Sequence, residues 1–540
     1  MARYMASRVS RRQMLKGTAL VLGSLSGSAI LAACGGGAPA APAKPAEAPK
    51  PTEAPKPTAA PAAPAAAASP AAAASPAAGA SPAAGASPAA SPAAAAPSAP
   101  SSAPAAAAKP AAGGAVVTIR DHDWIQGTPG QPNDWYDKFI GDWMKEHPNI
   151  KIEREWFPRL EMHAKQLALA ATGQLGDTVR INVAPTTAEL YLKKVVHDLD
   201  SLWKDDKEWT DKDQKQFWPG NIKTYTLAGK TWGLPVVGHP GSVNYYINKT
   251  MVEKAGLKVP PNDANWTYED LATLAKGLTQ SAGGRTTVYG ILPGFRTATA
   301  NEYMVGVMRG FGGDLFDADG KKCLLNTPES IKGLNAIADL YKSGSAYPWS
   351  ADLDTITQDL FVGGKVAIVN ATSAAAAKGG YPAQIAKSPS PFEMIVIPDP
   401  LGSTGKHATQ VSSDGKTVSA QTKNPAEAWT VLSRLFTSQQ HGIQRFANGL
   451  GSPGSRNDVW DSQEFRDTAP ALANVAKVLV LPPAPEMLPW FYPANGRYVE
   501  HEPILLNEFV KVSTGQLTVE QYAQNVGKQI QDIMDKPPVG

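Results

Sequence analysis

The composition of the chain changes abruptly near residue 113, and this boundary decides which part can fold. Residues 35–113 are almost all Ala, Pro, Ser and Gly. Such a segment buries too little apolar surface to offset the entropy lost on ordering, so we expect it to be disordered. Its prolines favour extended polyproline II, which is typical of a stalk that lifts a domain off a membrane. A hydrophobic core must therefore come from residue 114 onward.

The first 34 residues show the features of an export signal in the usual order. Five basic residues and no acidic one precede residue 35, and a Gly- and Ser-rich apolar run occupies 18–33. This run is too short for a membrane-spanning helix and suits a signal peptide. The pair Arg11-Arg12, followed by Gln13-Met14-Leu15-Lys16, favours the twin-arginine route over an ordinary secretory signal.

The apolar run ends in Leu31-Ala32-Ala33-Cys34, which resembles a bacterial lipobox. We predict that residues 1–34 form the lipoprotein signal and that Cys34 carries the lipid. The exported chain is then anchored at the outer face of the cytoplasmic membrane or in the periplasm, provided that more than one acyl chain is attached. Only Cys323 remains, so the mature chain has no intramolecular disulfide, and we expect this thiol to be partly buried and inert.

The folded part is mildly acidic and long enough for two lobes. After residue 113 there are 42 basic and 46 acidic residues, which gives a net charge of −4. The chain therefore lacks the basic footprint of a nucleic-acid-binding protein, and we expect no nucleic-acid partner. The roughly 427 remaining residues exceed what one hydrophobic core usually holds.

Short β-branched runs alternate with amphipathic segments, which predicts an α/β fold. The first elements are a strand at 115–120, a helix at 133–147, a strand at 150–156, a helix at 160–171 and a strand at 178–183. This βαβαβ order begins a doubly wound sheet. Later elements are a helix that opens at Thr267 with Asp270 as its capping partner, helices at 328–343, 424–436 and 518–534, and a buried strand at 366–369.

Polar and aromatic residues follow two of the predicted strands. Asp121, Asp123 and Trp124 come after the first strand, and Asn182 lies at the end of the third. Ligands of doubly wound sheets bind at the carboxyl ends of the strands. By position alone, residues 121–124 and 182–187 are ligand-binding candidates.

Nine landmarks in the folded part follow the order of one known family. They are 139–152 with its His147-Pro148 turn, 196–200, 229–235 (Gly-Lys-Thr-Trp-Gly-Leu-Pro), 245–249 (Tyr-Tyr-Ile-Asn-Lys), 266–271, 312–328, 361–368, 451–453 and 515–522. Together they resemble the family 1 extracellular solute-binding proteins, the maltose-binding-protein-like group of bacterial ABC importers, over nearly all of 114–535. One stretch departs: the family often has a tryptophan after the strand that matches 366–369, where this chain has Asn370-Ala371-Thr372-Ser373.

The resemblance implies a two-lobed periplasmic-binding-protein type II fold, in which doubly wound sheets flank a hinged interlobe cleft. Such lobes close on a ligand that touches both. We expect a first lobe of 114–240 and 403–457 and a second lobe of 241–402 and 458–540. The chain would cross between them near 237–245, 399–405 and 455–459, the first with hinge-compatible Gly238, Pro240 and Gly241.

The resemblance also implies a sugar or oligosaccharide as the solute. A sugar offers an apolar C–H face to aromatic rings and a rim of hydroxyls to polar side chains. The stacking candidates, for each of which core packing is the alternative, are Trp124, Trp232, Trp349 and Trp490. The polar candidates are Asp121, Asp123, Asn182, His239, Tyr245 and Asn370. We expect Trp135, Trp143 and Trp429 in the core, and Arg497 with Tyr498 as a cap on the cleft.

The expected partners are the small solute, the transmembrane subunits of an ABC permease, and the membrane through the lipid anchor. We expect a monomer without cofactor or metal, and not an enzyme. Glycosidase chemistry and a non-sugar solute (polyamine, peptide or phosphodiester) remain alternatives, as does an adhesive surface protein. No Gly-x-Ser-x-Gly, His-Glu-x-x-His or phosphate-loop motif is present. Glu500-His501-Glu502 suggests a metal cluster, but a solvated helix start is the preferred interpretation.

Overall fold

The computed structural model describes residues 115–124, 134–159, 161–181, 184–241, 243–294, 300–350, 353–407, 411–481 and 487–540. All of these belong to one unit, 100–540, of the two units into which the chain separates. The predicted export signal, the lipidated Cys34, the stalk and Asn182 lie outside the described residues, so these predictions stay predictions.

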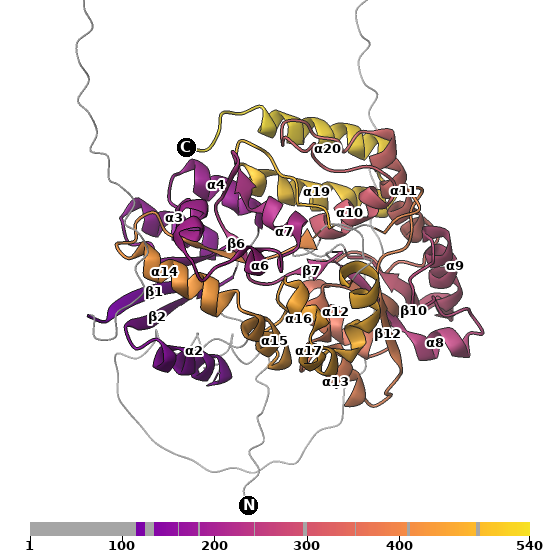
Figure 1. The fold of residues 1–540 in the computed structure, drawn as a ribbon. Coiled ribbons are helices and arrows are strands. Elements are labelled where there is room, and N and C mark those ends of the chain that lie inside the picture. Colours follow the sequence, from indigo (N-terminus) through magenta and orange to yellow (C-terminus); the bar gives the residue numbers. More distant parts are fainter. Residues whose placement is uncertain are drawn as a thin grey trace, which may run out of the picture. The chain divides into compact units, whose positions relative to one another are not determined.

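The first sheet confirms the predicted βαβαβ start. Its strand order is β2-β1-β3-β14-β6, with β1 parallel to both β2 and β3, and β14 antiparallel to β3 and β6 (Figure 1). We call this sheet with its helices the first lobe. Its strands are β1 (Val117–Trp124), β2 (Ile150–Phe157), β3 (Thr178–Ile181), β6 (Leu234–Pro235) and β14 (Gly415–Val418).

Strand β1 is longer than the sequence predicted. It runs through Trp124, whereas the prediction ended it at Arg120 and placed Asp121 after it. Acidic residues are unfavourable in strands, so composition alone argued for an earlier end. Parallel pairing with β2 continues without a break to Trp124 opposite Phe157, and this tertiary pairing decides where the strand ends.

The second sheet has the order β12-β8-β11-β10-β9. Strands β10 and β11 are parallel, and the other neighbours are antiparallel. We call this sheet with its helices the second lobe. Its strands are β8 (Asn244–Asn248), β9 (Gln280–Ala282), β10 (Arg285–Leu292), β11 (Val366–Ala371) and β12 (Met394–Ile397); the short pairs are β4 (Thr226–Leu227) with β5 (Lys230–Thr231) and β7 (His239–Pro240) with β13 (Val411–Ser412).

Local signals set several helix starts. The Thr267 side chain accepts a hydrogen bond from the Asp270 backbone N–H. The Asp270 carboxylate in turn accepts one from the Thr267 backbone N–H, as predicted. In chain order the helices up to β11 are α2 (Asp134–Glu146), α3 (Met162–Ala171), η1 (Ala184–Thr186), α4 (Thr187–Leu192), α5 (Leu199–Asp205), α6 (Asp211–Gln214), α7 (Pro219–Thr224), α8 (Lys249–Lys254), α9 (Tyr268–Leu278), α10 (Ala300–Gly310), α11 (Pro328–Lys342) and α12 (Leu353–Val362).

One predicted helix, 424–436, is two elements in the structure: α14 (Pro425–Thr430) and the π-helix η3 (Val431–Phe436). The hydroxyls of Thr430 and Ser433 donate to the carbonyls of Ala426 and Trp429, four residues earlier, and such bonds distort a helix. The remaining helices are η2 (Ser373–Ala376), α13 (Tyr381–Ala386), α14 (Pro425–Thr430), η3 (Val431–Phe436), α15 (Gln439–Ala447), α16 (Asn457–Asp461), α17 (Gln463–Thr468), η4 (Pro470–Leu472), α18 (Ala473–Val475), η5 (Ala476–Val480), α19 (Tyr498–Ser513) and α20 (Val519–Met534).

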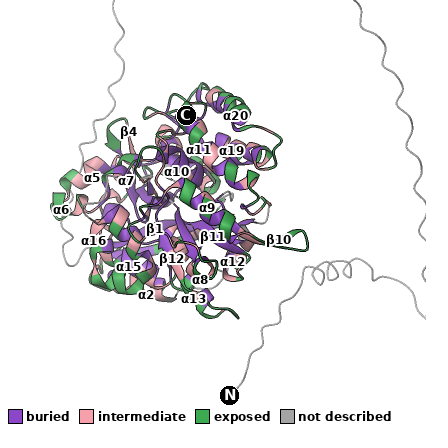
Figure 2. Cartoon of the chain, turned by 90° about the vertical axis from the view of Figure 1, so that its right-hand side faces the viewer, coloured by how far each residue is buried: buried purple, intermediate pink, exposed green. Residues whose placement is uncertain are grey.

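Each sheet packs into apolar cores, around strands such as the fully buried β11 (Figure 2), whereas β9 is exposed. In β8, Tyr245 and Ile247 face one core and Tyr246 faces another, as the two-residue period of a strand requires. Trp143 and Trp429 are buried in the first lobe and Trp135 packs against the same core, which confirms the prediction. No helix in the described ranges is long and apolar enough to span a membrane.

Two segments that run between the two sheets, and a third at 453–455, meet side by side. Strand β7 pairs with β13, and the backbone N–H of Gly238 donates to the Pro453 carbonyl at 3.0 Å. A Cβ at Gly238 would lie 2.5 Å from the Trp218 ring and 2.6 Å from the Ser455 Cβ, so only glycine permits this approach. The first and third predicted crossings are thus adjacent in space, and their assignment as interlobe crossings stays a prediction.

The second crossing lies later than the predicted 399–405. The Leu401 N–H donates to the Trp266 carbonyl at 2.8 Å, and the Thr404 hydroxyl donates to the Gly310 carbonyl at 2.9 Å. These contacts hold the segment on the second lobe, so the chain returns to the first lobe only at β13. Turn-forming residues marked a loop correctly, but packing decided which lobe carries it.

Candidate functional site

A buried ionic cluster lies on one face of the first sheet, beside the crossing segments. Asp121 and Asp123 are two residues apart in β1, so their side chains share a face. The Lys416 ammonium of β14 ion-pairs with both, at 3.0 Å from Asp123. The Thr178 hydroxyl donates to Asp121 at 2.6 Å. All of these side chains are buried, so in this structure they hold the sheet together.

Arg180 extends the cluster towards the crossing segments. Its guanidinium lies 3.0 Å from the Asp414 carboxylate and 3.9 Å from Asp123. Burial by itself raises the pKa of Asp123, but the charges of Lys416, Arg180 and Arg445 outweigh it and hold this pKa below its ordinary value. Asp123 therefore stays ionised.

Trp124 ends β1 next to this cluster. It packs with Phe157 and Met162, and 9% of its surface is exposed. The guanidinium carbons of Arg159 and Arg180 lie 5.5 and 5.8 Å from its ring centre, within cation–π range. Its predicted stacking on a ligand is compatible with this position and stays a prediction.

Two glutamates of the second lobe lie across from Arg159. Glu302 is in the first turn of α10, and Glu502 is near the start of α19. The Ser412 hydroxyl of β13 donates to Glu302. Burial raises the pKa of each carboxyl to about 7, while the Arg159 charge opposes the rise. The sequence analysis missed both residues as ligand candidates, because a glutamate at a helix start is common and carries no distinctive signal.

The interpretation of 500–502 as a solvated helix start is wrong. His501 is fully buried against the rings of Phe316 and Tyr498, and burial lowers its pKa to about 3. Glu502 is half-buried. Within the described parts of the chain, no group of three or more His, Cys, Asp or Glu side chains could hold a metal ion.

His239 and Ser452 link two of the crossing segments. The Ser452 hydroxyl and the His239 Nε2 are 2.8 Å apart. Burial lowers the pKa of His239 to about 4, so its ring is neutral near pH 7. The ligand role of His239 stays a prediction, and the structure places this residue where β7 pairs with β13.

Tyr245 and Asn370 lie opposite each other on β8 and β11 of the second sheet. Both are fully buried, and the Tyr245 ring meets Trp266 edge-on at 5.3 Å. Burial raises the pKa of Tyr245 well above its ordinary value. The predicted contact of these two residues with a ligand stays a prediction.

The other tryptophan candidates are dispersed over separate clusters. Trp232 is half-buried against Tyr191 and donates to the Leu227 carbonyl at 3.0 Å. Trp349 is half-buried at the edge of both second-lobe cores. Trp490 is 6% exposed and belongs to the cluster that holds Tyr498, and this cluster lies beside Glu502. Of the three, Trp490 is the one that shares a cluster with Tyr498.

The predicted cap has two separate parts. Arg497 ion-pairs with Glu500 and donates to the Pro537 carbonyl at 2.9 Å, which ties it to the C-terminal segment. Tyr498 is buried, and its hydroxyl accepts a hydrogen bond from the Asn301 amide at 3.1 Å. Tyr498 therefore lies beside the glutamates, whereas Arg497 is engaged elsewhere.

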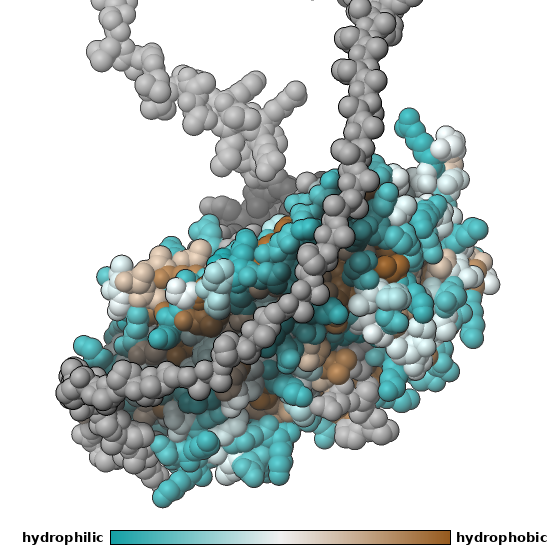
Figure 3. Space-filling model, turned by 90° about the horizontal axis from the view of Figure 1, so that it is seen from above, coloured by the Kyte–Doolittle hydropathy of each residue, from teal (hydrophilic) through white to brown (hydrophobic). Residues whose placement is uncertain are grey.

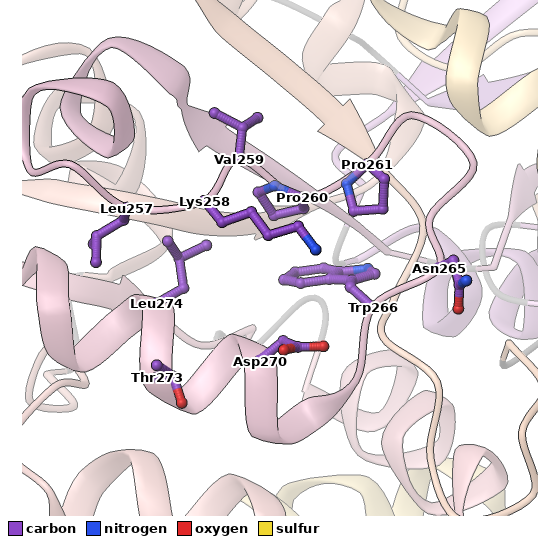
Figure 4. A pocket seen from close by; sticks show the side chains of 10 residues that line it. All are labelled: Leu257, Lys258, Val259, Pro260, Pro261, Asn265, Trp266, Asp270, Thr273 and Leu274. Carbon is purple, nitrogen blue, oxygen red and sulfur yellow. The ribbon is translucent and has the colours of Figure 1, made fainter.

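Two hollows on the second lobe contain none of the predicted site residues. One of about 110 Å³ lies between α9 and the loop before it, where the Lys258 side chain extends over Trp266 (Figure 4). This volume is below that of ordinary ligand pockets. The other, of about 360 Å³, is lined from one lobe only, by residues of 248–254, 362–364 and 388–392. Neither hollow can bring both lobes onto a ligand.

Few large hydrophobic side chains are exposed among the described residues. On the face seen from above, hydrophilic residues dominate and hydrophobic ones form small separate groups (Figure 3). The large hydrophobic side chains exposed among the described residues are isolated in the sequence: Val116, Leu488 and Val499. The polar groups beside the crossing segments are therefore the strongest candidate site.

Known proteins resemble this chain in sequence. It matches the profile of the family described as bacterial extracellular solute-binding protein over residues 129–441, more than half of its length. Curated proteins of Brucella abortus and Brucella suis that are named as binding proteins are 30% identical over 211 residues. These matches cover 39% of this chain and 47% of each relative, so they span about half the relatives' length.

Solved structures resemble the fold. MalE of Xanthomonas citri has a TM-score of 0.63 at 15% identity, over 77% of this chain and 97% of that one. An ABC substrate-binding protein of Listeria monocytogenes has a TM-score of 0.61 at 21% identity, over 77% and 98%. The GacH receptor of Streptomyces glaucescens has a TM-score of 0.61 at 20% identity, over 78% and 100%. These neighbours have the two-lobed type II periplasmic-binding-protein fold that the sequence predicted.

The sequence profile and the fold lead to one assignment. Two sheets joined by adjacent segments are the architecture of a two-lobed binding protein, and the profile covers every strand of both sheets except β1. This chain belongs to the bacterial extracellular solute-binding protein family.

Proposed function

We propose that this protein is the substrate-binding component of an ABC importer, which captures a sugar or oligosaccharide outside the cytoplasmic membrane and releases it unchanged to the permease. One observation carries the proposal: three crossing segments meet beside polar groups contributed by both lobes. Rotation about such a hinge brings both lobes onto one ligand, and the ligand stabilises the closed state through its extra contacts there.

The structural neighbours support a carbohydrate ligand. The Listeria protein is described in complex with cycloalternan, and the GacH receptor in complex with acarbose. MalE of Xanthomonas citri is described as a sugar-binding protein. Each of these ligands presents hydroxyl groups, which hydrogen-bond to carboxylates and guanidinium groups.

We assign the ligand site to the predicted residues together with three that the structure adds. Trp124 supplies the aromatic surface at the end of β1, and Arg159 holds a positive charge over its ring. Glu302 and Glu502 supply acceptors from the second lobe. Asp121 and Asp123 contribute indirectly, because their ion pairs with Lys416 fix the position of the end of β1.

The finer cellular assignments belong to the same proposal. The protein is exported by the twin-arginine route, is anchored through lipid on Cys34, and acts as a monomer with the transmembrane subunits of its permease. The lobe limits are 114–240 with 403–457 and 241–402 with 458–540. The contacts of 401–404 with the second lobe support moving the second limit towards β13.

Thermal unfolding of the full chain in detergent tests this function. Mono- and oligosaccharides, polyols and amino compounds are added in turn. A ligand that binds only the folded state raises the free energy of unfolding by about 2.7 kcal/mol at a hundredfold excess over its Kd. A rise with one saccharide class, without turnover, supports the proposal. Product formation during incubation overturns it in favour of a glycosidase, and a rise with non-sugar solutes alone removes the carbohydrate assignment.

A further inference from the structure

We propose that residues 487–496 form a strap that ties the two lobes together and sets the angle between them. This inference concerns how the lobes are held and applies to any solute, so it goes beyond the proposed function. The strap ends just before α19, and its backbone is hydrogen-bonded to residues of both lobes.

On the first-lobe side, the strap lies on α7, which packs against β6 of the first sheet. The Trp490 backbone N–H donates to the Thr224 hydroxyl at 2.9 Å, and the Tyr492 hydroxyl donates to the Thr224 carbonyl at 2.8 Å. Both hydrogen bonds are buried. A Cβ at Gly220 in the same helix would lie 1.8 Å from the Met487 carbonyl oxygen, so only glycine lets the strap lie this close.

On the second-lobe side, the strap is held by Arg309 of α10 and by the turn at Gly320. The Arg309 guanidinium donates to the Pro489 carbonyl at 3.0 Å. The Ala494 backbone N–H donates to the Gly320 carbonyl at 2.9 Å. A Cβ at Gly320 would lie 2.1 Å from the Tyr492 carbonyl oxygen. A glycine from each lobe therefore permits close approach of the same short backbone segment.

Apolar packing joins the same parts of the chain. The rings of Trp490 and Tyr492 form one buried cluster with Tyr498 of α19 and Ala188 of α4, and Leu227 of β4 packs against it. Helix α4 belongs to the first lobe, whereas α19 packs against α10 and α11 of the second. Separating the lobes here would expose this apolar surface to water, which is unfavourable.

The strap couples any movement between the lobes to a loss of contacts. It is a single short segment bonded to both lobes, so rotation of one lobe against the other must free it from α7 or from Gly320. Packed interfaces switch between discrete arrangements and do not deform continuously. We therefore expect two arrangements, one with the strap bound on both sides and one with it released on one side.

Pulsed electron paramagnetic resonance on the full chain in detergent measures the distance between the lobes without any solute. Nitroxide labels are attached through genetically encoded keto amino acids in place of Lys138 of α2 and Lys342 of α11, whose side chains are 76% and 63% exposed. The double variant Thr224→Val, Tyr492→Phe removes both hydrogen bonds to α7. Loss of two buried hydrogen bonds shifts the ratio of the two arrangements by roughly thirtyfold, so we expect one narrow distance in the native protein and a second distance in the variant.

Tyr522→Phe is the matched control, because the Tyr522 hydroxyl donates to the Leu505 carbonyl at 3.0 Å within the second lobe. It should leave the distance between the lobes unchanged. Gly220→Ala tests the strap independently, since its Cβ displaces Met487 from α7, and it should change the distance as the double variant does.

The native distance retained in the folded double variant or in folded Gly220→Ala overturns the strap. An equal change in Tyr522→Phe also overturns it, because general loosening then explains the result. Circular dichroism confirms that each variant is folded. Since no solute is added, these outcomes leave the proposed function untouched.

Discussion

The Lys416 ammonium lies 3.0 Å from the Asp123 carboxylate and also contacts Asp121, and these three side chains are at most 3% exposed. This arrangement joins β14, which enters the first sheet after the second crossing, to β1 at the amino-terminal start of the lobe. Because β14 directly follows β13, the ionic cluster connects the sheet to the hinge. Its integrity therefore affects both stability and lobe movement.

Replacing Lys416 by methionine should destabilise the protein strongly. The change leaves two buried carboxylates without their shared cation, and breaking a buried pair on one side costs about 3–5 kcal/mol. Urea unfolding followed by tryptophan fluorescence measures this loss. The matched control is Lys528→Met, where a 74% exposed lysine pairs with Asp532 on the surface of α20, and the expected change is within about 0.5 kcal/mol. Similar midpoints for the two variants would contradict the role of the buried cluster.

Substituting Gly238 by valine should separate the crossing segments. A Cβ there would lie 2.5 Å from the Trp218 ring and 2.6 Å from Ser455, and overpacking of this kind costs about 1–3 kcal/mol. Ligand affinity should fall as well, because the hinge geometry changes. Gly141→Ala in α2 is the control: nothing lies within 4 Å of its Cβ position, so helix propensity should raise stability by about 0.5–1 kcal/mol. A Gly238→Val protein with unchanged melting temperature and affinity would refute this account.

Burial of His501 should make stability depend on pH. Its folded pKa is about 3, whereas an unfolded histidine has a pKa near 6.5, so between these values the unfolded chain binds more protons. Stability from this residue is complete above about pH 6.5 and is lost as pH falls. Between pH 7.5 and 5, the free energy of unfolding of the native protein should fall by about 2 kcal/mol more than that of His501→Gln.

The comparison with the variant is necessary because Glu302 and Glu502 act in the opposite direction. Their folded pKa values, about 7, exceed those of unfolded glutamate, so the folded state gains protons as pH falls from 7. Denaturation curves at several pH values isolate the His501 contribution as a difference. His197→Gln, in a half-exposed position, controls for the loss of a histidine. Parallel pH profiles of the native protein and His501→Gln would rule out the predicted effect.

Replacing Cys34 by alanine should release the protein from the membrane. The prediction follows from the lipobox at 31–34, and fractionation of cells with lipid labelling measures it. Cys323→Ala is the control, since that thiol is partly buried and burial raises its pKa to about 11, which makes it unreactive. Attachment that survives Cys34→Ala, or that fails in Cys323→Ala, would disprove anchoring at Cys34.

Local patterns in the sequence predicted much of the fold. The alternation of strands and helices gave the βαβαβ start, and the Thr267–Asp270 pair gave the start of α9. Both depend on short-range physics: side-chain periodicity and backbone hydrogen bonds within a few residues. Motif order predicted the family, which the profile match confirms.

The candidate site was harder to predict, because its charges come from distant parts of the chain. Nothing near Lys416 in the sequence indicates Asp121, 295 residues away, as its partner. Burial in the folded chain raises the pKa values of Glu302 and Glu502, and the charges of Asp414 and Glu502 raise that of Glu302 further. The loop at 399–405 was recognised, and the predicted lobe limit at 402 lies before Thr404, which still bonds to the second lobe.

The sequence by itself determined the secondary-structure order, the two-lobed class and the family, because these follow from periodicity, composition and motif order along the chain. Only the tertiary structure decided where β1 ends, where the second crossing lies and which charges meet beside the hinge. Those outcomes depend on strand pairing, desolvation and Coulomb interactions between residues that are remote in sequence, and such energies exist only once the chain has folded.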